Sequence, residues 1–115
     1  MEQNITSDEK IEQLIHKMRS IISEYAKAKA ERKYLEEFRK SKKAILMGEL
    51  PGAVGHVREA YAYSHPDYIK VLEGIKEAVE TEEDLGWRLK TAEFEIDIWR
   101  TRQANSRAER KAYGA

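Results

Sequence analysis

Residues that could carry catalysis are scattered through this chain of 115 residues and form no recognised motif. None of the six serines lies in the sharp glycine-flanked turn that presents a hydrolase nucleophile to its histidine base. No glycine-rich loop ends in Gly-Lys-Ser or Gly-Lys-Thr, so the sequence has no phosphate-cradling loop. The absence of cysteine removes thiolate nucleophiles and thiolate zinc sites. We therefore expect a protein that is not an enzyme and that needs no cofactor.

Metal binding is also not expected from the histidine and carboxylate spacing. A di-iron helical bundle needs Glu-x-x-His pairs, and the sequence has none. Glu12 and His16 are one helical turn apart, and we interpret them as a surface pair rather than as metal ligands. We interpret His56 and His65 as loop and cap residues near a bend.

Basic and acidic residues balance at 21 each, yet they are segregated along the chain. Residues 27–43 hold eight cations and three anions, and residues 99–115 hold five cations and one anion. Residues 66–98 hold ten anions and four cations. Two explanations remain open. The basic and acidic stretches pair with each other within the fold or between subunits, or the basic stretches bind a polyanion.

The basic stretches supply the candidate ligands for nucleic-acid phosphates, because Lys and Arg neutralise phosphate charge. Tyr61 and Tyr63 are candidate stacking platforms for unpaired bases, and Tyr61 can equally close a small core with Tyr68. The acidic stretch is the alternative working surface, as a protein-binding face. The candidate phosphate ligands are Arg39, Lys40, Lys42, Lys43, Arg100, Arg102 and Arg107, and the candidate protein-binding residues are Glu77, Glu80, Glu83 and Asp84.

Glycine and proline divide the chain into two long segments and a turn-rich middle. The expected elements, within a single domain over 1–115, are a helix over about 7–47, a loop with a short helix over 48–64, and a helix over about 65–112. Ser64 is the expected N-cap of the last helix, with Pro66 in its first turn.

Apolar residues in the first long segment recur with the alternating steps of three and four residues that are typical of a coiled coil. The stripe breaks at Arg32, where we expect a phase slip that shifts the buried face. The second long segment carries a broad stripe that Glu82 and Glu83 interrupt midway. The stripe residues are Ile11, Leu14, Met18, Ile21, Tyr25 and Ala28, then Leu35, Phe38, Ile45 and Leu46 after the break, and Tyr68, Leu72, Ile75, Val79, Gly86, Leu89, Ile96 and Trp99 in the second segment.

These elements predict an all-α fold: a long antiparallel helical hairpin, like a coiled coil, with a short helix at the bend. One hairpin covers each helix on one side only, so we expect a homo-oligomer, and a compact monomeric three-helix bundle is the alternative. No apolar run is long enough to span a membrane, and the polar residues 1–4 do not resemble a signal peptide. We therefore expect a cytoplasmic protein with no membrane partner.

Four short stretches are distinctive, namely EYAKA over 24–28, FRKSKKA over 38–44, SHPDY over 64–68 and WRT over 99–101. They resemble small helical proteins encoded in the replication and recombination regions of tailed phages. The order of parts is similar to that of the recombination mediators of T-even phages, with a lysine-rich helix, a glycine-containing bend, a long helix and a basic aromatic tail. The resemblance implies an oligomer that binds single-stranded DNA in a bacterial host cell. It also implies that the protein helps to load a recombinase onto strands covered by single-strand-binding protein.

The sequence thus favours a non-enzymatic accessory protein of DNA recombination or replication. The alternative is a coiled-coil adaptor or inhibitor that acts on a host or phage protein through its acidic helix face. Clustered lysines favour the first function, and clustered acids favour the second.

Overall fold

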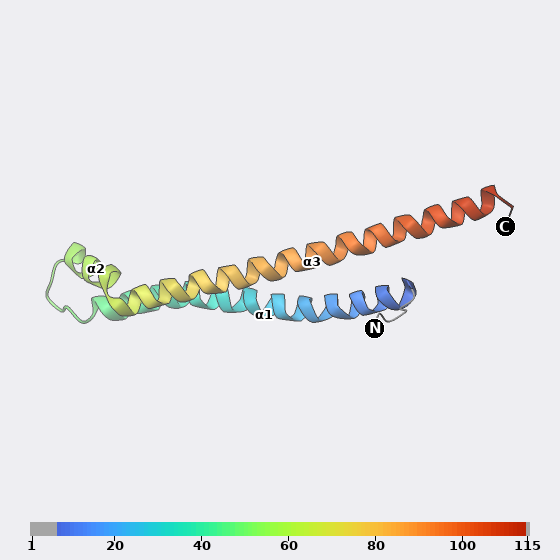
Figure 1. Ribbon diagram of the computed structural model, residues 1–115. Helices are drawn as coiled ribbons and strands as arrows, with labels where there is room; N and C mark the ends of the chain where they lie inside the picture. The colour runs from blue at the N-terminus through green and yellow to red at the C-terminus, as the bar shows by residue number, and fades with distance from the viewer. Residues whose placement is uncertain (1–6, 115) are drawn as a thin grey trace. The chain divides into compact units, whose positions relative to one another are not determined.

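The computed structural model describes residues 7–114, and all regular structure in this range is helical. The helices are α1 (Ser7–Met47), α2 (Gly55–Ser64) and α3 (Pro66–Ala112) (Figure 1). The prediction of an all-α chain is confirmed. Residues 1–4, on which the expectation about a signal peptide rests, lie outside the described residues.

The chain forms two compact units, each built from part of α1 and part of α3. The bend unit is Tyr25–Asp84 and includes α2. The terminal unit combines the described residues up to Glu24 with those from Leu85 onward. Each unit has its own covered apolar residues, and the prediction of a single domain stays a prediction.

The helical segments run antiparallel within each unit. In the bend unit Arg32 of α1 pairs with Glu82 of α3, whereas Lys42, further along α1, pairs with the earlier residue Asp67. In the terminal unit the first turns of α1 share a groove with the late turns of α3. The hairpin arrangement predicted from the sequence is therefore present within both units, while the homo-oligomer stays a prediction.

The covered side chains of α1 follow one heptad register without interruption. The predicted phase slip at Arg32 is wrong, because Phe38 and Ile45 are exposed and the cations of α1 occupy seam positions instead. Long Arg and Lys side chains can lay their apolar stems along a seam while their charged groups reach water. The α1 seam consists of Ile11, Leu14, Met18, Ile21, Tyr25, Ala28, Arg32, Leu35, Arg39, Lys42 and Leu46.

The seam of α3 also differs from its prediction. Val71 and Ala78 are covered, whereas the predicted Leu72 and Val79, each one residue later, are exposed. The smaller side chain therefore occupies the seam at position 78. The α3 seam consists of Tyr68, Val71, Ile75, Ala78, Glu82, Leu85, Leu89, Ala92, Ile96, Trp99 and Gln103.

A small core closes the bend unit where the three helices meet. Leu46 of α1, Ala62 of α2 and Tyr68 of α3 are its buried members, and Met47 and Tyr61 pack against them. Apolar burial at this junction holds α2 against the two long helices.

The connection between α2 and α3 corrects the predicted cap. Ser64 is the last residue of α2, and its hydroxyl donates to the Ala60 carbonyl at 2.7 Å. The cap of α3 is His65, whose Nδ1 accepts the Asp67 backbone N–H at 3.0 Å. Pro66 begins α3 as predicted, because the first helical position needs no N–H donor.

The charged residues that interrupt the two apolar stripes, Arg32 in α1 and Glu82 in α3, pair with each other in the bend unit. Arg32 donates from Nε and Nη2 to the carboxylate of Glu82, and from Nη1 to Glu36 at 3.1 Å. An arginine fork that grips a carboxylate satisfies both charges at a half-covered position. The pair therefore replaces an apolar layer of the seam and needs no shift of register.

Protonation of Glu82 is expected to remove part of the stability of the bend unit. The hydrogen bond from Arg32 lowers the pKa of Glu82 below its ordinary value of 4.5. The stabilisation is therefore complete above that value and is lost as the pH falls through the lower pKa of the folded state. We expect Glu82→Gln to lower the melting temperature by about 5 °C near pH 7 and by much less near pH 3.

Thermal melts followed by circular dichroism at the two pH values check this expectation. Glu83→Gln is the matched control, because Glu83 is the exposed neighbour of Glu82. The control should melt like the unsubstituted chain at both pH values. An equal fall in melting temperature for Glu82→Gln at both pH values would show that protonation of the Glu82 carboxylate is not coupled to the stability of the bend unit.

Candidate nucleic-acid interface

The lysine cluster of α1 is engaged by acids within the bend unit. Lys42 pairs with Asp67 of α3 at 3.7 Å, and Lys43 pairs with Glu59 of α2 at 3.5 Å. Lys40 pairs with Glu37 on its own helix at 3.2 Å. Binding of a phosphate by these lysines would therefore compete with ion pairs that already exist.

Two cations of this cluster are further constrained by their surroundings. Arg39 is a half-buried seam residue of α1. The Lys43 ammonium lies 4.6 Å from the centre of the Tyr63 ring. The pKa of Lys43 is raised by a hydrogen bond with Tyr63 and also by the nearby Glu59 carboxylate. Much of each side chain therefore faces protein.

The two candidate stacking tyrosines differ in accessibility. Tyr61 packs on the bend core, donates its hydroxyl to Glu49, and meets the His65 ring edge-on at 5.5 Å. The bond to Glu49 raises the pKa of Tyr61. Tyr63 is exposed, although its ring contacts Tyr68 edge-on at 5.4 Å. Tyr61 is thus chiefly a structural residue, and Tyr63 is the more open ring.

The basic end of α3 has a different environment. We call Arg100, Arg102, Arg107, Arg110 and Lys111 the arginine end; all five are exposed. Arg100 pairs with Asp97 at 3.9 Å, and Arg110 donates to the Ser106 carbonyl at 3.5 Å. Within residues 7–114, Arg102 and Arg107 make no ion pair or hydrogen bond. The arginine end is therefore the part of the predicted site whose cations are open to an incoming anion.

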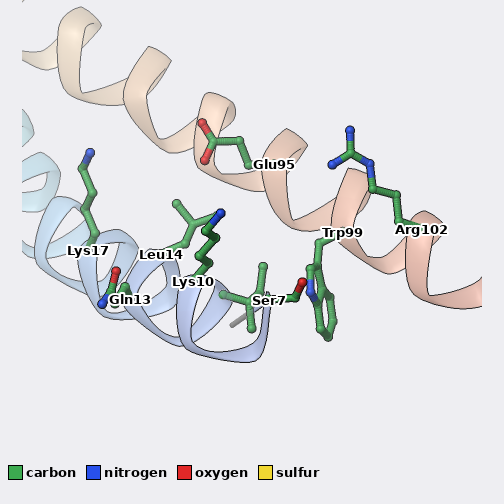
Figure 2. Close-up of a pocket in the computed structure, with 9 residues that line it drawn as sticks. Ser7, Lys10, Gln13, Leu14, Lys17, Glu95, Trp99 and Arg102 are labelled. Carbon is green, nitrogen blue, oxygen red and sulfur yellow. The ribbon is translucent and has the colours of Figure 1, made fainter. Parts of the chain in front are cut away.

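A groove of about 400 Å³ adjoins the arginine end in the terminal unit (Figure 2). Trp99 reaches from α3 to the first turn of α1, while Lys10 and Lys17 line the groove from α1. Arg102 lies at the rim with its guanidinium directed away from α1, and Glu95 is the acid of the lining. The groove thus gathers three cations and one anion around an aromatic side chain.

Trp99 stands between this groove and a second, smaller hollow. The second hollow has a volume of about 240 Å³ and is lined by Asp8, Trp99, Arg100, Gln103 and Arg107. The Trp99 Nε1 is buried and has no hydrogen-bond partner in the described chain. A buried N–H without an acceptor costs roughly 1–3 kcal/mol, so an acceptor placed there would be stabilised.

Lys10 and Lys17 are members of this site that were not predicted from the sequence. They lie in residues 1–26, which hold three cations and five anions, so the local charge pattern gives no signal for them. Their place beside Trp99 depends on the pairing register of α1 with α3, which only the folded unit reveals.

The candidate protein-binding acids lie on the exposed surface of α3 in the bend unit. Glu77, Glu80, Glu83 and Asp84 are all exposed. Val79 and Leu72 are exposed on the same helix. The acids are thus accessible to a partner, and apolar side chains accompany them.

No known protein family, curated protein or solved structure matches the chain. No helix within residues 7–114 has the length and the apolar character to cross a membrane. Nor do three histidine or carboxylate groups of this range gather as a metal site would require. Any function is therefore argued from charge and geometry.

Proposed function

We propose that the protein is a non-enzymatic accessory of DNA recombination or replication that binds single-stranded DNA as an oligomer. Binding uses the arginine end of α3. The observation that carries the proposal is the contrast in pairing between the two basic clusters: Lys40, Lys42 and Lys43 of α1 pair with acids, whereas Arg102 and Arg107 are exposed and have no partner within residues 7–114.

Unpaired guanidinium groups suit phosphate binding. A guanidinium can donate two parallel hydrogen bonds to one phosphate, and no ion pair of Arg102 or Arg107 within residues 7–114 of the same chain has to break first. Lys10 and Lys17 add charge from α1. The contacts address the backbone of a strand, so binding would tolerate any base sequence.

The acidic face of α3 is the proposed contact for a protein partner. Glu77, Glu80, Glu83 and Asp84 would repel a nucleic acid, so DNA and a partner such as a recombinase or a single-strand-binding protein would use different surfaces. This division suits a loading factor in the cytoplasm of a bacterial host.

Binding to a labelled oligothymidylate at two salt concentrations tests the proposal, with light scattering on the same samples. We expect an oligomer that binds at low salt and releases as salt is raised, because phosphate neutralisation displaces counterions from the strand. Absence of binding at low salt by an intact oligomer would overturn the proposal.

The second candidate function is a coiled-coil adaptor or inhibitor that acts through the acidic face. The exposed Leu72 and Val79 favour it, because a protein partner would cover apolar side chains along with the acids. This function predicts no oligonucleotide binding at any salt concentration, so the same titration separates the two.

A further inference from the structure

α3 carries a second apolar stripe on the face that does not meet α1. Trp87, Phe94 and Ile98 are 61%, 66% and 50% exposed. Trp87 and Phe94 each lie midway in sequence between two seam residues, which places them on the opposite side of the helix. Together with Thr91 they follow the alternating spacing of a coiled-coil core, and we call these four residues the outer stripe.

Exposed apolar residues of this size in one row are unusual for an isolated helix surface. The seam of α3 is already occupied by α1 within each unit, so the outer stripe needs another helix to cover it. We infer that the occupant is the outer stripe of a second copy of this chain, with the two α3 helices parallel and in register.

Charge complementarity favours a second copy as the occupant. In a parallel pair, the residue just before one core position faces the residue just after the next core position of the partner helix. Lys90 then faces Glu95 of the second copy, and Asp97 faces Arg102. Each of these contacts joins opposite charges, and twofold symmetry repeats each one.

The charges also favour the parallel direction over the antiparallel one. An antiparallel pair would set Arg88 against Glu95 and Lys90 against Asp97, but Arg102 would face the uncharged Thr81. Arg88 already has an interaction within its own chain, whereas Arg102 makes no ion pair within residues 7–114, so only the parallel direction gives a partner to an unpaired cation. The parallel pair also brings the two arginine ends to the same end of the dimer.

The inference is argued from the two faces of α3 and does not rest on nucleic-acid binding. If DNA binding proves absent, the proposed interface between the two α3 helices is still tested separately by the experiments below. If both hold, a strand meets the arginine ends of both copies jointly, which raises affinity, and a phosphate at Arg102 competes with Asp97 of the second copy.

Single cysteines test the interface, because the chain has none of its own. Position 101 continues the outer stripe. In a parallel pair, the cysteine of Thr101→Cys would lie next to the same cysteine of the second copy. In an antiparallel pair, the two cysteines would lie far apart. We expect most of the Thr101→Cys chain to form a disulfide-linked dimer under mild oxidation without DNA. The control Ser23→Cys, on the exposed surface of α1, should stay largely uncrosslinked.

A charge placed in the outer stripe provides the second measurement. Phe94→Glu should halve the mass seen by light scattering and leave the helical circular dichroism unchanged, since Phe94 contributes nothing to the seam. Ile45→Glu, at an exposed position of α1, is the matched control and should keep the parental mass. An unlinked Thr101→Cys, or a Phe94→Glu chain that retains the parental mass, would overturn the inference.

Discussion

Replacing Arg102, Arg107 and Arg110 together with glutamine is expected to weaken binding to single-stranded DNA by roughly 30- to 100-fold at low salt. All three are exposed near the end of α3, and each substitution removes one phosphate contact. Every phosphate neutralised on a single strand contributes about 0.7 to the slope of log affinity against log salt, so the slope should fall by about 2. Anisotropy titrations of a labelled oligothymidylate over a salt series measure both quantities.

The control for this variant removes the same charge from the other unit. Lys27, Lys29 and Lys33 are exposed on α1, and replacing them with glutamine changes the net charge equally. We expect less than a threefold loss of affinity and an unchanged salt slope. If the two variants lose affinity alike, binding follows the overall charge of the chain and has no defined site.

The lysine cluster is tested by a third variant of equal charge. Replacing Lys40, Lys42 and Lys43 with glutamine should weaken binding less than the arginine variant does, because these lysines already pair with Glu37, Asp67 and Glu59. A larger loss of affinity than that of the arginine variant would show that the nucleic-acid interface lies in the bend unit.

The helical elements could be predicted because their signals are local. The middle of the chain concentrates glycine and proline, while the flanking segments repeat apolar residues with a helical period. The seams could not be predicted in full, because where two adjacent residues are both apolar, hydropathy does not decide which of them faces the paired helix. Ala78 is buried beside the more hydrophobic but exposed Val79, and Arg32 keeps the register because Glu82 lies opposite.

The candidate site could also be predicted only in part, because the sequence gives the charges but not their pairing. Net charges of +5 for residues 27–43 and +4 for residues 99–115 mark both stretches as basic, but the pairing of each cation depends on the register between helices. The register sets Asp67 beside Lys42 and leaves Arg107 without an acid partner in the described chain. It also brings Lys10 to Trp99, residues far apart in the sequence.

Leu46→Ala is expected to cause the largest loss of stability among single substitutions in this chain. Leu46 is 1% exposed and joins α1 to Ala62 and Tyr68 in the bend core. Truncating a buried leucine costs about 2–5 kcal/mol, from lost apolar burial and from the cavity that remains. For a chain of this length that corresponds to a fall of about 10–20 °C in melting temperature, measured by circular dichroism.

Ile45→Ala is the control that makes this substitution informative. Ile45 is adjacent, similar in volume and 59% exposed, so its truncation leaves no cavity, and alanine is the better helix former. We expect its melting temperature to stay within about 3 °C of the parent. A shifted register would bury both residues and make the two losses similar. A single heptad register from Ile11 onward buries Leu46 alone, so a large loss confined to Leu46→Ala would show that α1 keeps its register past Arg32.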